Sequence, residues 1–249
     1  MKKQLRLISL ALVLVMLLLA ASSCKKNKGD GGSDGESSGG GLVNSFDLDV
    51  SSDSLYVEKV ENMPADFIMG MDASCVPALE ASGVKYYDYD GSEKDVYEIL
   101  RDNGINYIRV RIWNDPYDKN GNGYGGGNCD LDNAIEVGKR ATQYGLKLLV
   151  NFHYSDFWAD PAKQMVPKAW SGMNSTEMSD ALYEYTKESL QKLVDAGIDV
   201  GMVQIGNETN GYMCGFKNWT DISNLMRSGW KHQASGVAET VGRLSSGKS

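Results

Sequence analysis

The feature of this sequence that most constrains its fold is a regular alternation of strand-like and helix-like segments. Strand-like runs are expected at 67–72, 105–113, 147–154 and 200–208. Between them, apolar residues recur at spacings of three and four, which predicts helices. Because strand, helix and strand follow one another in this order, the pattern predicts βαβ units and a parallel sheet.

Residue types at the segment ends predict where the helices start and stop. Helix starts are expected at Ser92 with Asp95 three residues later, at Asp130, and at Ser175 or Thr176. Helix stops are expected at the glycines that follow three helical runs: Gly104, Gly145 and Gly197. Another helical pattern begins with Ile222, Leu225 and Met226, and is expected to be lost after Gly229.

The spacing of the units favours one α/β architecture. The expected strands start at 67, 105, 147 and 200, which is one unit in about 44 residues. A doubly wound sheet would carry a glycine-rich first turn for a phosphate, and the turn after Met71 is not of this kind. A (β/α)8 TIM barrel needs eight units. We therefore expect residues 66–249 to be a truncated (β/α)8 domain, holding about strands 1–4 with their helices and an atypical tail at 229–249.

The first 65 residues do not follow this pattern. Residues 1–23 have a basic start, an apolar run and small residues, as in a secretory signal peptide. The small residues directly before Cys24 resemble a bacterial lipoprotein signal. The alternative is an ordinary signal peptide with a chance cysteine. Residues 24–45 are expected to be the lipidated Cys24 and a Gly/Ser-rich tether, and 46–65 a lead-in segment. This predicts a lipid-anchored protein of the bacterial cell envelope, in the outer membrane or at the cell surface.

Composition excludes several classes of partner. The net charge of −8 argues against a nucleic-acid surface. With two histidines and no CxxC pair, a zinc site is not expected. Without Cys24, three cysteines remain, Cys75, Cys129 and Cys214, which permit at most one intramolecular bridge. The glycine-rich run 120–128 lacks the lysine of a phosphate loop and is expected to be a flexible insertion.

Polar and aromatic residues gather at the expected carboxyl ends of the strands, where a barrel places its chemistry. These residues are Asp72, Arg109, Arg111, His153, Trp158, Asn207 and Glu208, with Trp170 downstream. The Asn-Glu pair suits sugar chemistry, because the amide can bind a hydroxyl while the carboxyl protonates a glycosidic oxygen. Exposed aromatic rings on nearby loops would give flat platforms for sugar rings. The two arginines are two positions apart and should share one face of a strand, as ligands of a carboxylate or as an ion-paired structural pair.

Four blocks of sequence resemble one known family. RVRIWNDPY at 109–117 and HYSDFWADP at 153–161 are similar to the second and third strands of glycoside hydrolase family 53, the arabinogalactan endo-β-1,4-galactanases. FIMGMDAS at 67–74 and VQIGNE at 203–208 are similar to its first and fourth strands. The resemblance covers about residues 66–228 in order.

The resemblance implies a retaining endo-hydrolase of β-1,4-galactan or arabinogalactan in plant cell walls. Glu208 would be the acid/base and Asn207 would hold the sugar 2-hydroxyl, with Asp72, Arg111, His153, Trp158 and Trp170 as further substrate-binding residues. The family's nucleophile lies on strand seven. Glu239 is only 31 residues beyond Glu208, too close to be that residue.

Several expectations for the chain follow. We expect little or no activity from the 249-residue chain, since strand seven would be absent. One alternative is a surface-tethered galactan-binding protein without catalysis, and another is a related barrel hydrolase of a different β-1,4-glycan. No cofactor is implied, and the calcium loops of some family members would lie in the part that is absent here.

Overall fold

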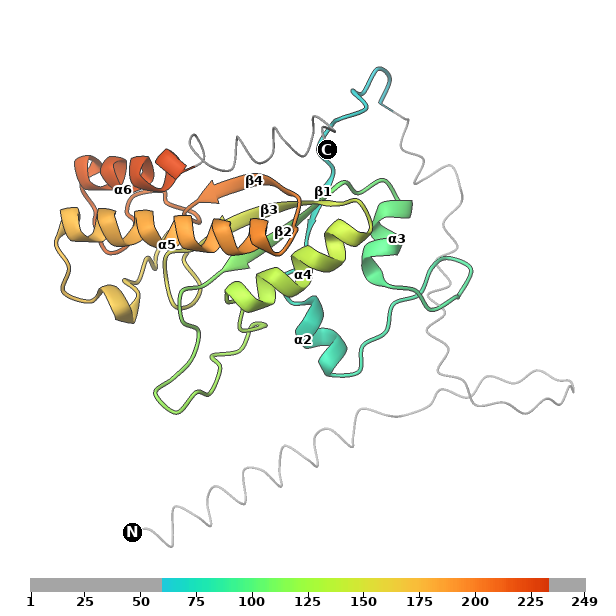
Figure 1. Cartoon of the computed structure of the whole chain (residues 1–249), viewed down its shortest axis with the longest axis horizontal. Coiled ribbons are helices and arrows are strands. Elements are labelled where there is room, and N and C mark those ends of the chain that lie inside the picture. The colour runs from blue at the N-terminus through green and yellow to red at the C-terminus, as the bar shows by residue number, and fades with distance from the viewer. Residues whose placement is uncertain (1–59, 233–249) are drawn as a thin grey trace, which may run out of the picture. The chain divides into compact units, whose positions relative to one another are not determined.

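The computed structural model describes residues 60–232, which contain one four-stranded parallel sheet with helices (Figure 1). The strands are β1 (Gly70–Asp72), β2 (Tyr107–Ile112), β3 (Lys147–Phe152) and β4 (Val200–Ile205). They lie in the order β1-β2-β3-β4, and every neighbouring pair is parallel. Each connection carries at least one helix, so the predicted βαβ arrangement is confirmed.

The helices connect the strands and flank the sheet. They are α2 (Val76–Ala81), α3 (Val96–Asp102), α4 (Leu131–Gln143), the short 3-10 helix η1 (Lys168–Trp170), α5 (Ser175–Asp195) and α6 (Trp219–His232). Helix α4 packs against β2 and β3, and α5 packs against α6. The short helices α2 and η1 were not expected from the sequence, because six and three residues are too few to show a helical period.

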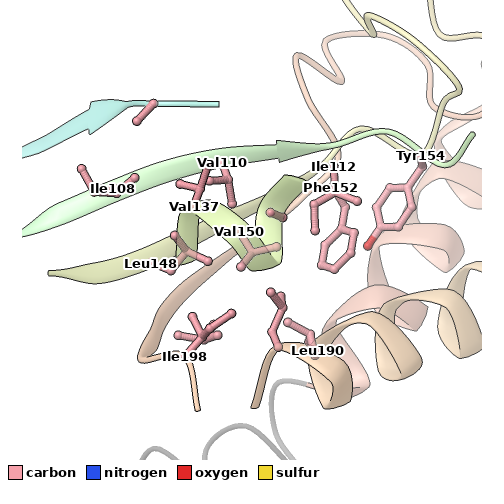
Figure 2. Close-up of a cluster of buried hydrophobic side chains, with 14 of the residues drawn as sticks. Ile108, Val110, Ile112, Val137, Leu148, Val150, Phe152, Tyr154, Leu190 and Ile198 are labelled. Atoms are coloured by element: carbon pink, nitrogen blue, oxygen red, sulfur yellow. The ribbon is translucent and has the colours of Figure 1, made fainter. Parts of the chain in front are cut away.

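Apolar and polar side chains alternate along β2 and β3, which gives the sheet one apolar face and one polar face. Ile108, Val110 and Ile112 on β2, with Leu148, Val150 and Phe152 on β3, are all fully buried on the side of α4 (Figure 2). The intervening positions of these strands include Arg109, Arg111 and Asn151. The apolar core therefore lies between the sheet and its helices, and the opposite face is left for polar groups.

The strands are shorter than the sequence predicts, particularly at their carboxyl ends. The expected strand 147–154 ends at Phe152, and the expected strand 200–208 ends at Ile205. Tyr154 and Glu208 both have left-handed backbone angles, with φ of 50° and 49°, so neither can continue a strand. At β1, pairing begins only at Gly70, opposite Tyr107. Residues 67–69 precede the ladder.

Two predicted helix starts are wrong by a few residues. Helix α3 is capped by Asp95, whose side chain accepts from the Tyr97 amide, and not by Ser92. Helix α5 is capped by Asn174 in a capping box with Glu177, one residue before the predicted start. In both cases a nearer carboxylate or amide oxygen meets the free amides of the first turn.

The other predicted ends are confirmed. Asp130 caps α4, and the three glycines that follow α3, α4 and α5 all have positive φ. Helix α6 continues through Gly229 to His232, so the helical pattern persists slightly further than expected.

The glycine-rich loop adopts a hydrogen-bonded turn. Asp118 accepts hydrogen bonds from the backbone amides of Asn120 and Asn122, and Tyr117 forms a bridge with Gly123.

Several predictions fall outside the described residues. The signal peptide, Cys24, the tether, most of the lead-in, Glu239 and the tail beyond His232 belong to this group. Within residues 60–232, no helix is long and apolar enough to cross a membrane.

Candidate active site at the carboxyl ends of the strands

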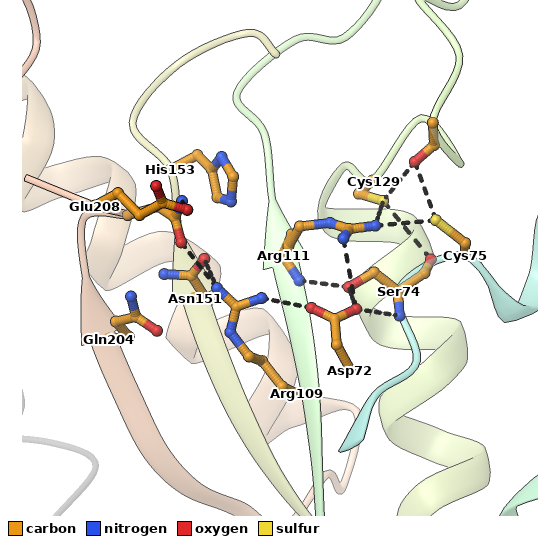
Figure 3. A network of polar contacts seen from close by, with 12 residues as sticks. Asp72, Ser74, Cys75, Arg109, Arg111, Cys129, Asn151, His153, Gln204 and Glu208 are labelled. Carbon is orange, nitrogen blue, oxygen red and sulfur yellow. Dashed lines mark hydrogen bonds and ion pairs between the residues drawn. The ribbon is translucent and has the colours of Figure 1, made fainter. Parts of the chain in front are cut away.

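The four strands bring polar residues together at one edge of the sheet (Figure 3). Asp72 ends β1, Arg109 and Arg111 lie on β2, and Asn151 lies on β3. Asn207 follows β4 after one glycine. Because the strands are parallel neighbours in one sheet, their carboxyl ends meet, as the sequence predicts.

Arg109 connects all four strands through its guanidinium group. Its Nη1 donates to Asp72 Oδ2 at 2.5 Å, and its Nη2 donates to Asn151 Oδ1 at 2.7 Å and to Asn207 Oδ1 at 2.9 Å. Such a planar fork of donors holds three acceptors in fixed directions. Arg109 is thus a positioning residue for this edge of the sheet.

Asp72 is held as a carboxylate between the first two strands. Its Oδ1 accepts from the Ser74 amide at 3.1 Å and from the Ser74 hydroxyl at 2.7 Å. Burial tends to raise the pKa of Asp72, but the Ser74 hydrogen bonds and the charges of Arg111 and Arg109 outweigh it and lower the pKa below its ordinary value. Asp72 therefore serves as the counter-charge of the two arginines.

Asn207 and Glu208 occupy a tight turn after β4. The Asn207 amide donates to the Ala159 carbonyl at 2.8 Å, while its second Nδ2 hydrogen is near Glu208 Oε1, at an N–O distance of 3.4 Å. The buried Gln164 donates to the Asn207 carbonyl at 2.8 Å. The Glu208 carboxyl is exposed in this turn, on a left-handed residue whose backbone strain is typical of functional positions.

His153 is a buried neutral imidazole with one unused donor. Its Nδ1 accepts from Trp113 Nε1 at 3.2 Å and from the Ala159 amide at 3.1 Å, which places the proton on Nε2. Burial, together with the charges of Arg109 and Arg111, lowers its pKa to about 3. Within the described part of the chain, the buried Nε2 has no hydrogen-bond partner. It is a spare donor for a ligand oxygen, which would have to displace part of the packing around the ring to reach it.

Arg111 lies beneath an aromatic ring at the same edge. Its guanidinium carbon is 4.4 Å from the centre of the Trp158 ring, and its Nη1 is 3.6 Å from Asp72 Oδ1. Trp158 remains 38% exposed. The ring thus has one face on a cation and enough open surface for an apolar sugar face.

Trp170 is placed differently from the other predicted site residues. It is 7% exposed and packs against Tyr154 and Tyr185 in the core. This placement offers no open ring face to a ligand, so its substrate-binding role stays a prediction that the packing does not favour. The buried ring stabilises the loop that follows β3.

Sequence reasoning missed two positioning residues, Asn151 and Gln164. Both are polar side chains buried among site residues, where a polar group without a partner would be costly. Asn151 is an amide within an otherwise apolar strand, KLLVNF, and this is the signal that the sequence offered. Gln164 lies in a loop, and only the fold shows which carbonyls it reaches.

The described residues offer no site for a metal ion. No group of three or more His, Cys, Asp or Glu side chains within 60–232 converges in a way that could hold one.

The site can be compared with known proteins. The model of the family described as "Glycosyl hydrolase family 53" matches residues 68–240, which is most of the chain. The chain belongs to glycosyl hydrolase family 53. The resemblance seen in the four strand blocks is thereby confirmed.

Two relatives illustrate this membership. The chain is 55% identical over 181 residues to the endo-beta-1,4-galactanase of Bacillus subtilis (strain 168), covering 73% of this chain and 42% of that protein. It is 42% identical over 164 residues to the arabinogalactan endo-beta-1,4-galactanase of Humicola insolens, covering 64% of this chain and 46% of the relative. The chain thus spans less than half the length of these family 53 relatives.

A solved structure agrees on the fold. The family 53 catalytic domain of Ignisphaera aggregans superposes with a TM-score of 0.68 at 43% identity, over 71% of this chain and 50% of that domain. Family 53 domains are (β/α)8 barrels, and the four parallel strands with their helices correspond to part of one. The predicted fold class is confirmed.

Proposed function

We propose that this chain supplies the acid/base side of an endo-β-1,4-galactanase site. The substrate would be β-1,4-galactan or the arabinogalactan side chains of plant cell-wall polysaccharide. The observation that carries the proposal is the Asn207–Glu208 pair after β4, held in place by Arg109 and Gln164. Support for the substrate comes from the galactanase names of the family 53 relatives.

The geometry suits proton donation to a glycosidic oxygen. Glu208 is exposed at the sheet edge, where its carboxyl can reach the bond to be cut. Asn207 uses its oxygen on Arg109 and one amide hydrogen on Ala159, which leaves its second hydrogen beside Glu208. In this proposal that hydrogen would donate to the 2-hydroxyl of the sugar whose bond is broken, as the family resemblance implies for Asn207.

Two further groups would contact the sugar. The His153 Nε2–H is a neutral donor that keeps its proton at ordinary pH, because the pKa of His153 is far below neutral. Trp158 presents its ring next to Arg111 for stacking on a galactose face. Asp72 and Arg111 would then act mainly by fixing this edge of the sheet.

A retaining mechanism also needs a second carboxylate as nucleophile, about 5–5.5 Å from the acid/base. The family resemblance places it on strand seven, whereas residues 60–232 contain four strands. In this proposal the described residues would supply substrate binding and the proton donor. The nucleophile would have to come from outside them.

The test is hydrolysis of galactan by the chain and by a Glu208→Gln variant. Reducing ends are measured on galactan, with mannan and carboxymethyl cellulose as substrates that distinguish other β-1,4-glycanases. If the chain turns over galactan, Glu208→Gln should lower the rate by about 10²-fold or more. Glu188→Gln, on the exposed side of α5, is the matched control and should leave the rate unchanged. Equal rates for Glu208→Gln and the parent would remove Glu208 from the mechanism.

The exposed ring of Trp158 beside Arg111 supports a second candidate, galactan binding without catalysis. Binding is measured by calorimetry and by retardation in gels that contain galactan, and products are followed by chromatography. Retardation without oligosaccharide release would identify a binding protein. Retardation in a mannan gel but not in a galactan gel would contradict the substrate assignment.

We further propose that Cys24 carries a lipid that anchors the protein to the bacterial cell envelope. The basic start, apolar run and small residues at 1–23 support this. In cells fed a labelled fatty acid, the protein should take up label and sediment with membranes. Cys24→Ser should abolish both, and a Ser23→Ala control should retain them.

A further inference from the structure

Two cysteines lie together behind the candidate site. Cys75 follows β1 as the N-cap residue of α2, while Cys129 directly precedes Asp130, the cap of α4. Both are free thiols in the structure, and both lie close to Arg111 (Figure 3). The proposed hydrolase chemistry gives neither of them a role.

The two sulfur atoms share the same neighbours. Each thiol donates to the Gly126 carbonyl at 3.3 Å, and Arg111 Nη2 is 2.9 Å from Cys75 Sγ and 3.6 Å from Cys129 Sγ. A side-chain carbon placed on Gly127 would be 3.2 Å from both sulfurs. The two sulfurs therefore lie close together, against the same carbonyl and the same guanidinium.

The two thiols differ in how they can be reached. Cys129 is fully buried, and burial raises its pKa to about 11 despite the hydrogen bond and charge of Arg111, so it stays protonated. Cys75 is only half-buried, beside the Arg111 cation. An external reagent would meet Cys75 first, and Cys129 would react second from within.

We propose that Cys75 and Cys129 form an intramolecular disulfide by exchange with a small external disulfide such as oxidised glutathione. The Cys75 sulfur attacks one sulfur of the reagent, its proton leaves to solvent, and one reduced thiol departs. The Cys129 sulfur then attacks Cys75 in the mixed disulfide, loses its proton and releases the second reduced thiol. The two protein thiols are oxidised by two electrons, and one external disulfide is reduced to two thiols.

The cross-link would tie the turn after β1 to the loop that precedes α4. It closes a loop of about 54 residues, which constrains the unfolded chain. Arg111 would keep its ion pair with Asp72, since that contact uses Nη1 rather than Nη2. We expect the oxidised protein to melt at a temperature roughly 5–10 °C higher than the reduced protein.

To test this, the full chain is equilibrated in buffers with increasing ratios of oxidised to reduced glutathione. Free thiols are then blocked by alkylation, and the peptides are mapped by mass spectrometry. The expected result is a linked peptide pair containing Cys75 and Cys129, 2 Da below the sum of the reduced peptides. The same samples should show the rise in melting temperature. Alkylation of both cysteines at every ratio, or stable pairing of either with Cys24, Cys214 or glutathione, would overturn the proposal.

Three variants separate the cross-link from general effects of oxidation. Cys75→Ser should remove both the linked peptide and the dependence of melting on reductant, as should Cys129→Ser. The matched control is Cys214→Ser, which changes a buried thiol that donates to the Tyr154 carbonyl at 3.5 Å. This control should keep both properties. If the serine variants fold poorly, the melting temperature of the parent chain is compared with and without reductant. Equal melting temperatures would contradict the cross-link.

Discussion

Arg109 is the residue on which the geometry of the site depends most. Lysine keeps the charge but has one donor nitrogen instead of a planar fork, so it cannot hold Asp72, Asn151 and Asn207 together. We expect Arg109→Lys to weaken galactan binding about tenfold, and calorimetry measures this. Arg101→Lys replaces an exposed arginine on α3 and is the control. Equal weakening in both variants would show that loss of a guanidinium alone, and not of this network, is responsible.

His153 should make the stability of the protein depend on pH. Its pKa is about 3 in the folded protein and about 6.5 when unfolded, so below pH 6.5 only the unfolded chain takes up the proton. The free energy of unfolding should therefore fall as the pH falls, by about 3 kcal/mol between pH 6.5 and 4 from this residue alone. Urea titrations at several pH values measure it.

The pH dependence needs a variant to isolate it from the carboxylates, which also titrate in this range. His153→Gln keeps an acceptor for the Trp113 indole but carries no titrating group. Its unfolding free energy should fall with acid by about 3 kcal/mol less than that of the parent. His232→Gln changes the other histidine of the chain and should retain the parent's slope. Parallel slopes for His153→Gln and the parent would contradict the assignment.

The sequence indicated which polar residues gather at the carboxyl ends of the strands, but not what holds them there. Asp72, Arg111, His153 and Asn207 could be predicted because each ends or follows a strand of a recognisable block. Trp170 shows the limit, since a tryptophan in a loop has the same sequence signature whether it is buried or exposed. Contacts between distant segments, such as Gln164 with the Asn207 carbonyl, depend on loop paths that no local pattern encodes.

Among the helices, α5 has the most complete amino-terminal cap. Asn174 accepts from the amides of Thr176 and Glu177, and the Glu177 carboxylate accepts from the Asn174 amide in return. Asn174→Ala removes the side-chain half of this box and should cost about 1 kcal/mol of unfolding free energy. Chemical denaturation measures the loss. Thr176→Ala, two residues later on the exposed surface, should change stability by less than about 0.5 kcal/mol.

This helix also shows why boundaries are harder to predict than elements. Asn174, Ser175 and Thr176 are all good capping residues, so the sequence alone could not choose among them. In the structure Ser175 donates to Asp221 of α6 at 2.5 Å, which is a tertiary contact that favours the earlier cap. The existence of the helix followed from its long apolar period. The position of its first residue depends on the packing of α5 against α6, which the sequence alone does not show.

The described sheet has two strands with a single neighbour, β1 and β4. Apolar side chains near these edges are exposed: Phe67, Ile68, Met69 and Met71 near β1, and Met202 on β4. Open strand edges with apolar residues promote association. We expect the 249-residue chain to associate at micromolar concentration, which sedimentation velocity detects.

A charge at one edge tests whether the edge causes the association. Ile68→Lys should shift the chain toward the monomer, because a lysine near an edge strand disfavours pairing with another chain. Tyr89→Lys removes a side chain that is 94% exposed in the loop between α2 and α3, outside either edge strand, and should leave association unchanged. A monomeric parent chain at all concentrations would contradict this prediction.

For the molecule as a whole, the repeat of about 44 residues was enough to predict a parallel α/β fold and four strands in order. It was enough because each βαβ unit repeats the same local signals. The hydrogen bond from Arg109 to Asn151 could not be predicted in this way, because it depends on the register between β2 and β3.

The sequence separations between Arg109 and its partners also determine when its hydrogen-bond network can be completed during synthesis. Its three partners lie 37, 42 and 98 positions away along the chain, and Asn207 is the last of them to be made. At about 5–20 residues per second, roughly 5–20 s pass between translation of Arg109 and of Asn207. During that interval the nascent chain already has Asp72 to neutralise the arginine, and the turn at Asn207 and Glu208 can dock only when the fourth strand arrives.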